Sequence, residues 1–139
     1  ECEDNAFLTL KNKNNIVATL HSSATQWRHK FLLEMEFENG YINLDGILSS
    51  TRSYAPETMT IGRREFEDIT FAMGKPKEST TYYEYDESWD LELEEFINAI
   101  YGINPIKNGT SNDSLEIMKL VDFIYKISKV NSKQGLNDN

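Results

Sequence analysis

The stretch from His21 to Lys30 holds the side chains best suited to ligand chemistry in this 139-residue chain. It follows a β-prone run with small, hydrogen-bonding residues, then adds a tryptophan, an arginine and the second of the two histidines. Polyhydroxylated ligands are commonly held by such polar groups beside an aromatic ring. One interpretation is therefore a binding segment. The alternative is that Trp27 packs in the core and Arg28–Lys30 form an exposed turn.

The same stretch offers little for catalysis. His21 is conceivable as a base, but no partner carboxylate follows from the spacing. Ser22 and Ser23 would point to opposite faces of a strand, and no nucleophile-elbow motif surrounds them, which disfavours a hydrolase. The acidic run from Asp86 to Glu95 is better explained as a solvated helix face than as a metal site. The sequence therefore predicts no catalytic and no metal-binding residue.

The glycine pattern, the single cysteine and the net charge limit which cofactors and partners this chain can be expected to bind. No G-x-G-x-x-G follows a strand, so no cofactor site is expected in this chain. The single cysteine, Cys2, cannot form an internal disulfide and suits a reducing cytoplasm. A formal net charge of −9 disfavours nucleic acid and anionic membranes. No signal peptide and no apolar run of ~20 residues is seen, so we expect a cytoplasmic protein.

The first half of the chain has the patterns of β-strands. Leu33, Met35 and Phe37 alternate with Glu34 and Glu36, as in a strand with one buried face. Asparagine-rich segments at 11–15 and 38–40 are typical of hairpin turns. A loop is expected over 72–79. The strands are predicted at 6–10, 16–20, 31–37, 41–44, 58–61 and 80–85.

Two helices are predicted to follow. The first carries apolar residues at three- and four-residue spacing from Trp89 to Ile100, with Asp86 or Ser88 as cap and Gly102 after its end. The second carries a stripe from Ile117 to Ile127, capped by one of residues 111–113. Strands followed by helices indicate an α+β fold. We expect a mostly antiparallel open sheet of about six strands with both helices packed on one face.

Domain bounds of 4–130 are expected, with a polar tail over 131–139. If the helices cover one sheet face, the outer face must be solvated or covered by another chain. Six short segments within this domain occur in an order typical of one enzyme family. They are Asp4–Phe7, Ala18–Trp27, Glu36–Ile42, Asp86–Trp89, Glu94–Phe96 and Asn108–Leu115.

On these segments, residues 4–128 resemble the C-terminal domain of the Gfo/Idh/MocA family, which includes glucose–fructose oxidoreductase and inositol dehydrogenase. The resemblance implies a two-domain parent enzyme that transfers hydride between NAD or NADP and a sugar, an inositol or a nucleotide sugar. It implies that an N-terminal Rossmann domain binds the cofactor. The catalytic lysine would lie in that domain, and an Asp and His pair would lie just upstream of this chain. This chain alone would then be inactive.

The resemblance also places the substrate near the stretch described first. It nominates Thr25, Gln26, Trp27 and Arg28 as substrate-binding residues, with His21 as a further candidate. It implies a homo-oligomer formed through the outer sheet face. The alternative function is a stand-alone carbohydrate-binding or protein-interaction module, which the aromatic content and the open sheet face would also suit.

Overall fold

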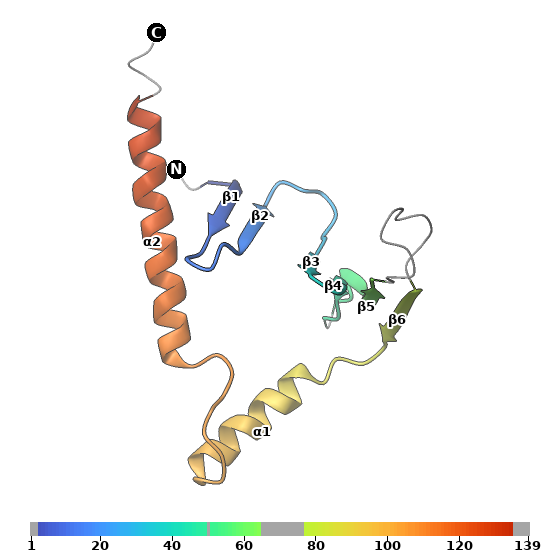
Figure 1. The fold of residues 1–139 in the computed structure, drawn as a ribbon. Helices are drawn as coiled ribbons and strands as arrows, with labels where there is room; N and C mark the ends of the chain where they lie inside the picture. Colours follow the sequence, from blue (N-terminus) through green and yellow to red (C-terminus); the bar gives the residue numbers. More distant parts are fainter. Residues whose placement is uncertain (1–2, 50, 65–76, 135–139) are drawn as a thin grey trace. The chain divides into compact units, whose positions relative to one another are not determined.

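The computed structural model describes residues 3–49, 51–64 and 77–134. It has six antiparallel strands in two sheets and two C-terminal helices, which confirms the predicted α+β class (Figure 1). The chain divides into two compact units, Glu1–Asp86 with the strands and Glu87–Asn139 with the helices. No helix among the described residues is long and apolar enough to cross a membrane.

The first sheet is a hairpin of β1 (Asn5–Lys11) and β2 (Val17–Ser23). The turn between them is organised by asparagines. Asn12 Oδ1 accepts the backbone N–H groups of Asn14 at 2.9 Å and Ile16 at 3.0 Å. Asn15 adopts φ 63°, a left-handed conformation that asparagine tolerates better than most residues. The antiparallel pairing of β1 with β2 confirms the predicted hairpin, and the Asn12 side chain accepts two backbone N–H groups of its turn.

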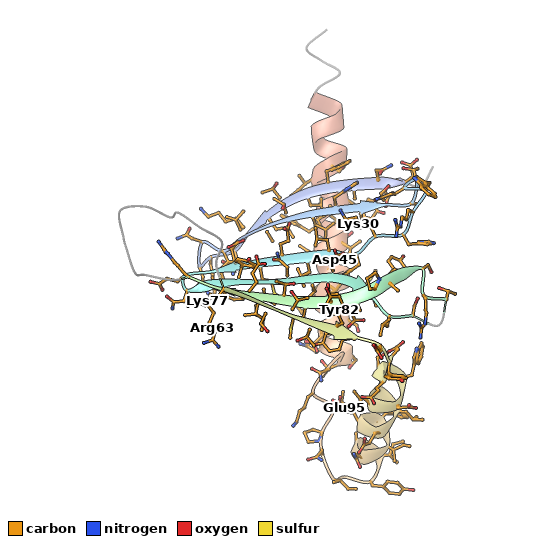
Figure 2. The ribbon with its side chains drawn as sticks, turned by 90° about the vertical axis from the view of Figure 1, so that its right-hand side faces the viewer. Lys30, Asp45, Arg63, Lys77, Tyr82 and Glu95 are labelled. Carbon is orange, nitrogen blue, oxygen red and sulfur yellow. The ribbon has the colours of Figure 1, made fainter. Side chains whose placement is uncertain are left out.

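The second sheet is a meander of β3 (Leu32–Phe37), β4 (Gly40–Ile47), β5 (Tyr54–Arg63) and β6 (Lys77–Tyr83), hydrogen-bonded in sequence order. In Figure 2, Arg63 and Lys77 lie at one end of the β5–β6 pair and Tyr82 lies toward the other. Gly40 has φ 150°, and a side chain there would clash with the Gly62 carbonyl oxygen. The glycine therefore lets β4 pass close to β5.

Strand lengths and grouping differ in detail from the sequence prediction. The six strands form two hydrogen-bonded sheets rather than one continuous sheet. The β5 strand extends well beyond 58–61 at both ends, and β6 begins at Lys77, inside the segment predicted as a loop. Residues 72–76 of that loop lie outside the described residues. The differences arise because cross-strand pairing, such as Arg63 opposite Lys77, extends strands that local propensity leaves weak.

The four-stranded sheet is amphipathic. Residues opposite each other in the register share a face, and the faces alternate along each strand. We call one side the apolar face; it carries Leu33, Met35, Ile42, Leu44, Met59 and Ile61 on β3 to β5, and the polar residues Ser79 and Thr81 on β6. We call the other side the polar face; it carries Glu34, Glu36, Tyr41, Asn43, Asp45, Thr58, Thr60, Glu78, Thr80 and Tyr82.

The first helix, α1 (Ser88–Ile100), ends as predicted at a glycine. Gly102 has φ 70°, its N–H donates to the Ala99 carbonyl, and the Ile103 N–H donates to the Asn98 carbonyl. This pair of bonds is a Schellman motif, which satisfies carbonyls at the helix end. The start differs from expectation, because the N-cap position is Glu87 and no side-chain cap bond forms there.

The second helix, α2 (Ser111–Gln134), begins one residue after Thr110. The cap is therefore Thr110 itself and not one of residues 111–113; Asp113 completes the cap from within the first turn. The helix continues to Gln134, so residues 131–134 of the predicted tail are helical. Lysine and glutamine in this stretch are good helix formers, which explains the extension. The packing of both helices on one sheet face stays a prediction.

Candidate functional site

His21 is placed by the β1–β2 hairpin. Its ring stacks on Phe7 with centroids 4.2 Å apart and planes 9° from parallel. The two residues are direct cross-strand partners in the register. Cross-strand aromatic pairs stabilise hairpins, so the position of His21 is explained by packing, and its role in substrate binding stays a prediction.

Thr25 is held by the turn that follows β2. Its hydroxyl oxygen accepts from Asn5 Nδ2 at 3.0 Å, and its backbone N–H donates to Ser23 Oγ at 3.2 Å. The Ala24 N–H donates to the Asp4 carbonyl at 2.7 Å. Thr25 therefore ties the end of β2 to the start of β1.

The other candidates of the segment are exposed. Trp27 has 94% of its surface accessible, but no apolar side chain among the described residues is buried, so both interpretations of Trp27 stay predictions. Gln26 and Arg28 are exposed as well. Single exposed apolar side chains are common on protein surfaces, so the exposure of Trp27 by itself assigns it no role.

His29 connects this segment to a second loop. Its ring lies 4.9 Å from the ring of Tyr54, tilted by 42°. Tyr54 is the first residue of β5, and the loop before it contains Arg52 in a left-handed conformation with φ 53°. The contact brings the predicted binding segment against the loop that precedes β5, although His29 and Tyr54 lie 25 positions apart in the sequence.

A cavity of about 530 Å³, wide open to solvent, lies between that loop and the chain at the end of β6. This volume is within the range of ordinary small-molecule sites. None of the five predicted site residues lines it. Its lining residues are Leu48, Arg52, Ala55, Pro56, Tyr82, Tyr83, Glu84 and Tyr85.

The cavity lining combines aromatic rings with one group of each charge. Tyr82 and Tyr85 are 69% and 82% exposed, so their rings and hydroxyls are available to a ligand. Among the described residues, the Arg52 guanidinium forms no ion pair. Arg52 offers only donors and the Glu84 carboxylate offers only acceptors, while tyrosine offers both. Such a set can match the alternating donors and acceptors of a polyhydroxylated ligand.

Sequence reasoning missed this cavity. The signal was the tyrosine cluster at 82, 83 and 85, which we interpreted only as a strand pattern. Tyr82 and Tyr83 point to opposite faces inside the strand. Both residues nevertheless contribute to the lining of one cavity, because they stand at the end of β6, where Tyr83 makes the last pairing, with Glu57.

The polar face carries its own hydrogen-bond network. The Tyr41 hydroxyl donates to Glu78 Oε1, and the hydroxyls of Thr60 and Thr80 lie 2.9 Å apart. The bond to Glu78, with smaller contributions from burial and from the charges of Glu78 and Glu36, raises the pKa of Tyr41 above 10.0. Asn43 Oδ1 is buried and lacks a hydrogen-bond partner. This face is therefore ordered by side-chain bonds between neighbouring strands.

We also searched the described residues for a metal site and compared the chain with known proteins. No group of three or more His, Cys, Asp or Glu residues within the described ranges could hold a metal ion. Comparisons with protein families, with curated proteins and with solved structures find no match to this chain.

Proposed function

We propose that this chain is the substrate-side domain of an NAD(P)-dependent oxidoreductase that acts on a sugar, an inositol or a nucleotide sugar in the cytoplasm. The six sequence segments between Asp4 and Leu115, which occur in the order typical of the Gfo/Idh/MocA family, support this assignment. The observation that carries the substrate class is the cavity lined by Arg52, Glu84 and three tyrosines. Aromatic rings can cover the apolar C–H face of a sugar, while the charged groups bond its hydroxyls.

The described residues do not fit a dinucleotide. Such a site uses a glycine-rich turn between a parallel strand and a helix, whereas every strand pair described here is antiparallel. In this proposal NAD(P) is bound by the parent protein's Rossmann domain. The role left to this chain is to hold and orient the substrate, which contributes to catalysis by fixing the reacting carbon.

Subunit contacts are the second part of the proposal. If α1 and α2 cover the apolar face, the polar face is the outer face, and a second copy could cover it in an isologous dimer. Light scattering tests this directly: a discrete dimer or tetramer is expected. A monomer at all concentrations would contradict it and would favour the stand-alone module.

The stand-alone carbohydrate-binding module is supported by one observation of its own. All residues of the cavity belong to the strand unit of this chain, so sugar binding needs no second domain. The coding sequence before Glu1 separates the two functions. An encoded glycine-rich βαβ unit supports the oxidoreductase, and a start codon directly before Glu1 supports the module.

The binding proposal is tested by titrating the isotopically labelled chain with inositols, hexoses, nucleotide sugars and NAD. Amide shifts are expected near Arg52, Tyr82 and Tyr85 for at least one sugar-like ligand, and none for NAD. Micromolar binding of NAD, about −8 kcal/mol, would overturn the assignment of the cofactor to another domain. Sugar binding that shifts only other residues would overturn the cavity as the site.

A further inference from the structure

The edge strand β3 has one hydrogen-bonded neighbour, β4. The Gly46 N–H donates to the Phe31 carbonyl at 3.0 Å, which identifies a hydrogen-bonded pair just before β3. Such pairs alternate along an antiparallel ladder. Leu33 and Met35 therefore bond to β4, and the backbone N–H and C=O groups of residues 32, 34 and 36 point away from it.

These outward groups form an open edge. Within the described part of the chain, no backbone hydrogen bond reaches residues 32, 34 or 36 from another strand or loop. The segment from Leu32 to Phe37 contains no proline, no lysine and no bulge, and its only charged side chains are Glu34 and Glu36. The backbone of this edge is therefore a template for a further strand, and the two carboxylates restrict which strand can pair.

The side chains along this edge define what can pair with it. On the apolar face, Leu33 is 42% exposed and Phe37 is 58% exposed. On the polar face lie Glu34 and Glu36, with Asp45 on the neighbouring strand opposite Leu32. A matching strand therefore needs apolar residues on one face and positive charge on the other.

A second copy of β3 does not meet this requirement. The two antiparallel registers that overlap the strand most fully place Glu34 opposite Glu34 of the other copy, or opposite its Glu36. Like charges directly opposite each other destabilise a strand pair. Glu34 and Glu36 thus disfavour pairing with a second copy of β3 and favour pairing with a positively charged strand.

We propose that the β3 edge binds an extended protein segment that carries lysine or arginine at alternate positions with apolar residues between them. The backbone groups of residues 32, 34 and 36 supply the ladder, and Glu34 and Glu36 select the basic side chains. The net charge of −9 attracts such a segment at long range. This inference is independent of the proposed oxidoreductase function.

The test uses the full chain and synthetic peptides of alternating lysine and valine. A control peptide has glutamate in place of lysine, and a second has N-methyl groups on the amides that would face the edge. Hydrogen exchange is expected to slow at residues 32, 34 and 36 with the lysine peptide only. The double variant Glu34→Gln, Glu36→Gln should weaken its binding about fivefold, whereas Glu92→Gln, Glu94→Gln on α1 should not.

Three results would overturn the proposal. Equal binding of the lysine and glutamate peptides would remove the role of the two carboxylates. Full binding of the N-methylated peptide would show that no ladder forms. Protection of the same amides in the chain alone, with a concentration-dependent rise in mass, would show that the edge pairs with a second copy.

Discussion

Thr110 and Asp113 bond each other reciprocally at the start of α2. The Asp113 N–H donates to Thr110 Oγ1 at 3.2 Å, and the Thr110 N–H donates to Asp113 Oδ2 at 3.0 Å. This capping box satisfies two donors that the helix backbone leaves open. Thr110→Ala should destabilise the helical unit by about 1 kcal/mol, measured by denaturant unfolding followed by circular dichroism. Thr110→Ser keeps the hydroxyl and should be nearly neutral; equal loss in both variants would argue against the cap.

Glu95 should make the helical unit sensitive to acid (Figure 2). Its Oε1 accepts the backbone N–H groups of Lys107 and Asn108, and these bonds lower its pKa below 4.5. Because the folded pKa is depressed, the stabilisation is present above pH 4.5 and is lost as pH falls through the folded value. Carbon-detected NMR titration should show Glu95 titrating below 4.5. Glu95→Gln should remove this part of the acid dependence, and an unshifted Glu95 would contradict the hydrogen bonds.

Tyr41, Gly62 and Glu78 should behave as one cluster. The Tyr41 ring lies over Gly62, where an added Cβ would clash with it, and its hydroxyl donates to Glu78. Gly62→Ala should destabilise the strand unit by about 1–3 kcal/mol through overpacking, measured by chemical unfolding. The same change in a Tyr41→Ala background should cost much less. Equal costs in both backgrounds would mean that the ring does not cover Gly62.

The same cluster predicts a response at high pH. The folded pKa of Tyr41 is raised, so its contribution to stability is present below pH 10.0 and is lost as pH rises through the folded value. Glu78→Gln removes the charged acceptor and should lower the Tyr41 pKa. The readout is the tyrosinate absorbance of the variant minus that of the parent chain. Thr80→Ala on the same strand is the control and should leave the titration unchanged.

Arg52 should contribute to ligand affinity and little to folding. For a ligand found in the sugar titration, Arg52→Gln should raise the dissociation constant at least about tenfold, the value of one charged hydrogen bond. The unfolding free energy should change by less than about 0.5 kcal/mol. Arg63→Gln makes the same charge change at the other end of the sheet and should leave binding intact. Equal effects of both variants would point to general electrostatics rather than to the cavity.

Local patterns predicted much of the fold because local physics decides those features. The alternation of Leu33, Met35 and Phe37 with two glutamates follows from the strand period. The turn at 12–16 follows from asparagine chemistry, and the end of α1 follows from Gly102. The start of α1 could not be predicted in this way, because its N-cap residue, Glu87, is not a preferred cap and makes no side-chain cap bond.

The sequence by itself determined the α+β class and the order of the strands and helices. Only the tertiary structure decided that the strands divide into two sheets and that His29 lies against Tyr54. It also decided that Arg52 shares a cavity with Tyr82 and Tyr85. The pairing of strands brings together residues about 30 positions apart in the sequence. The local alternation of residue types predicts a strand but does not specify which residues of two strands lie opposite each other.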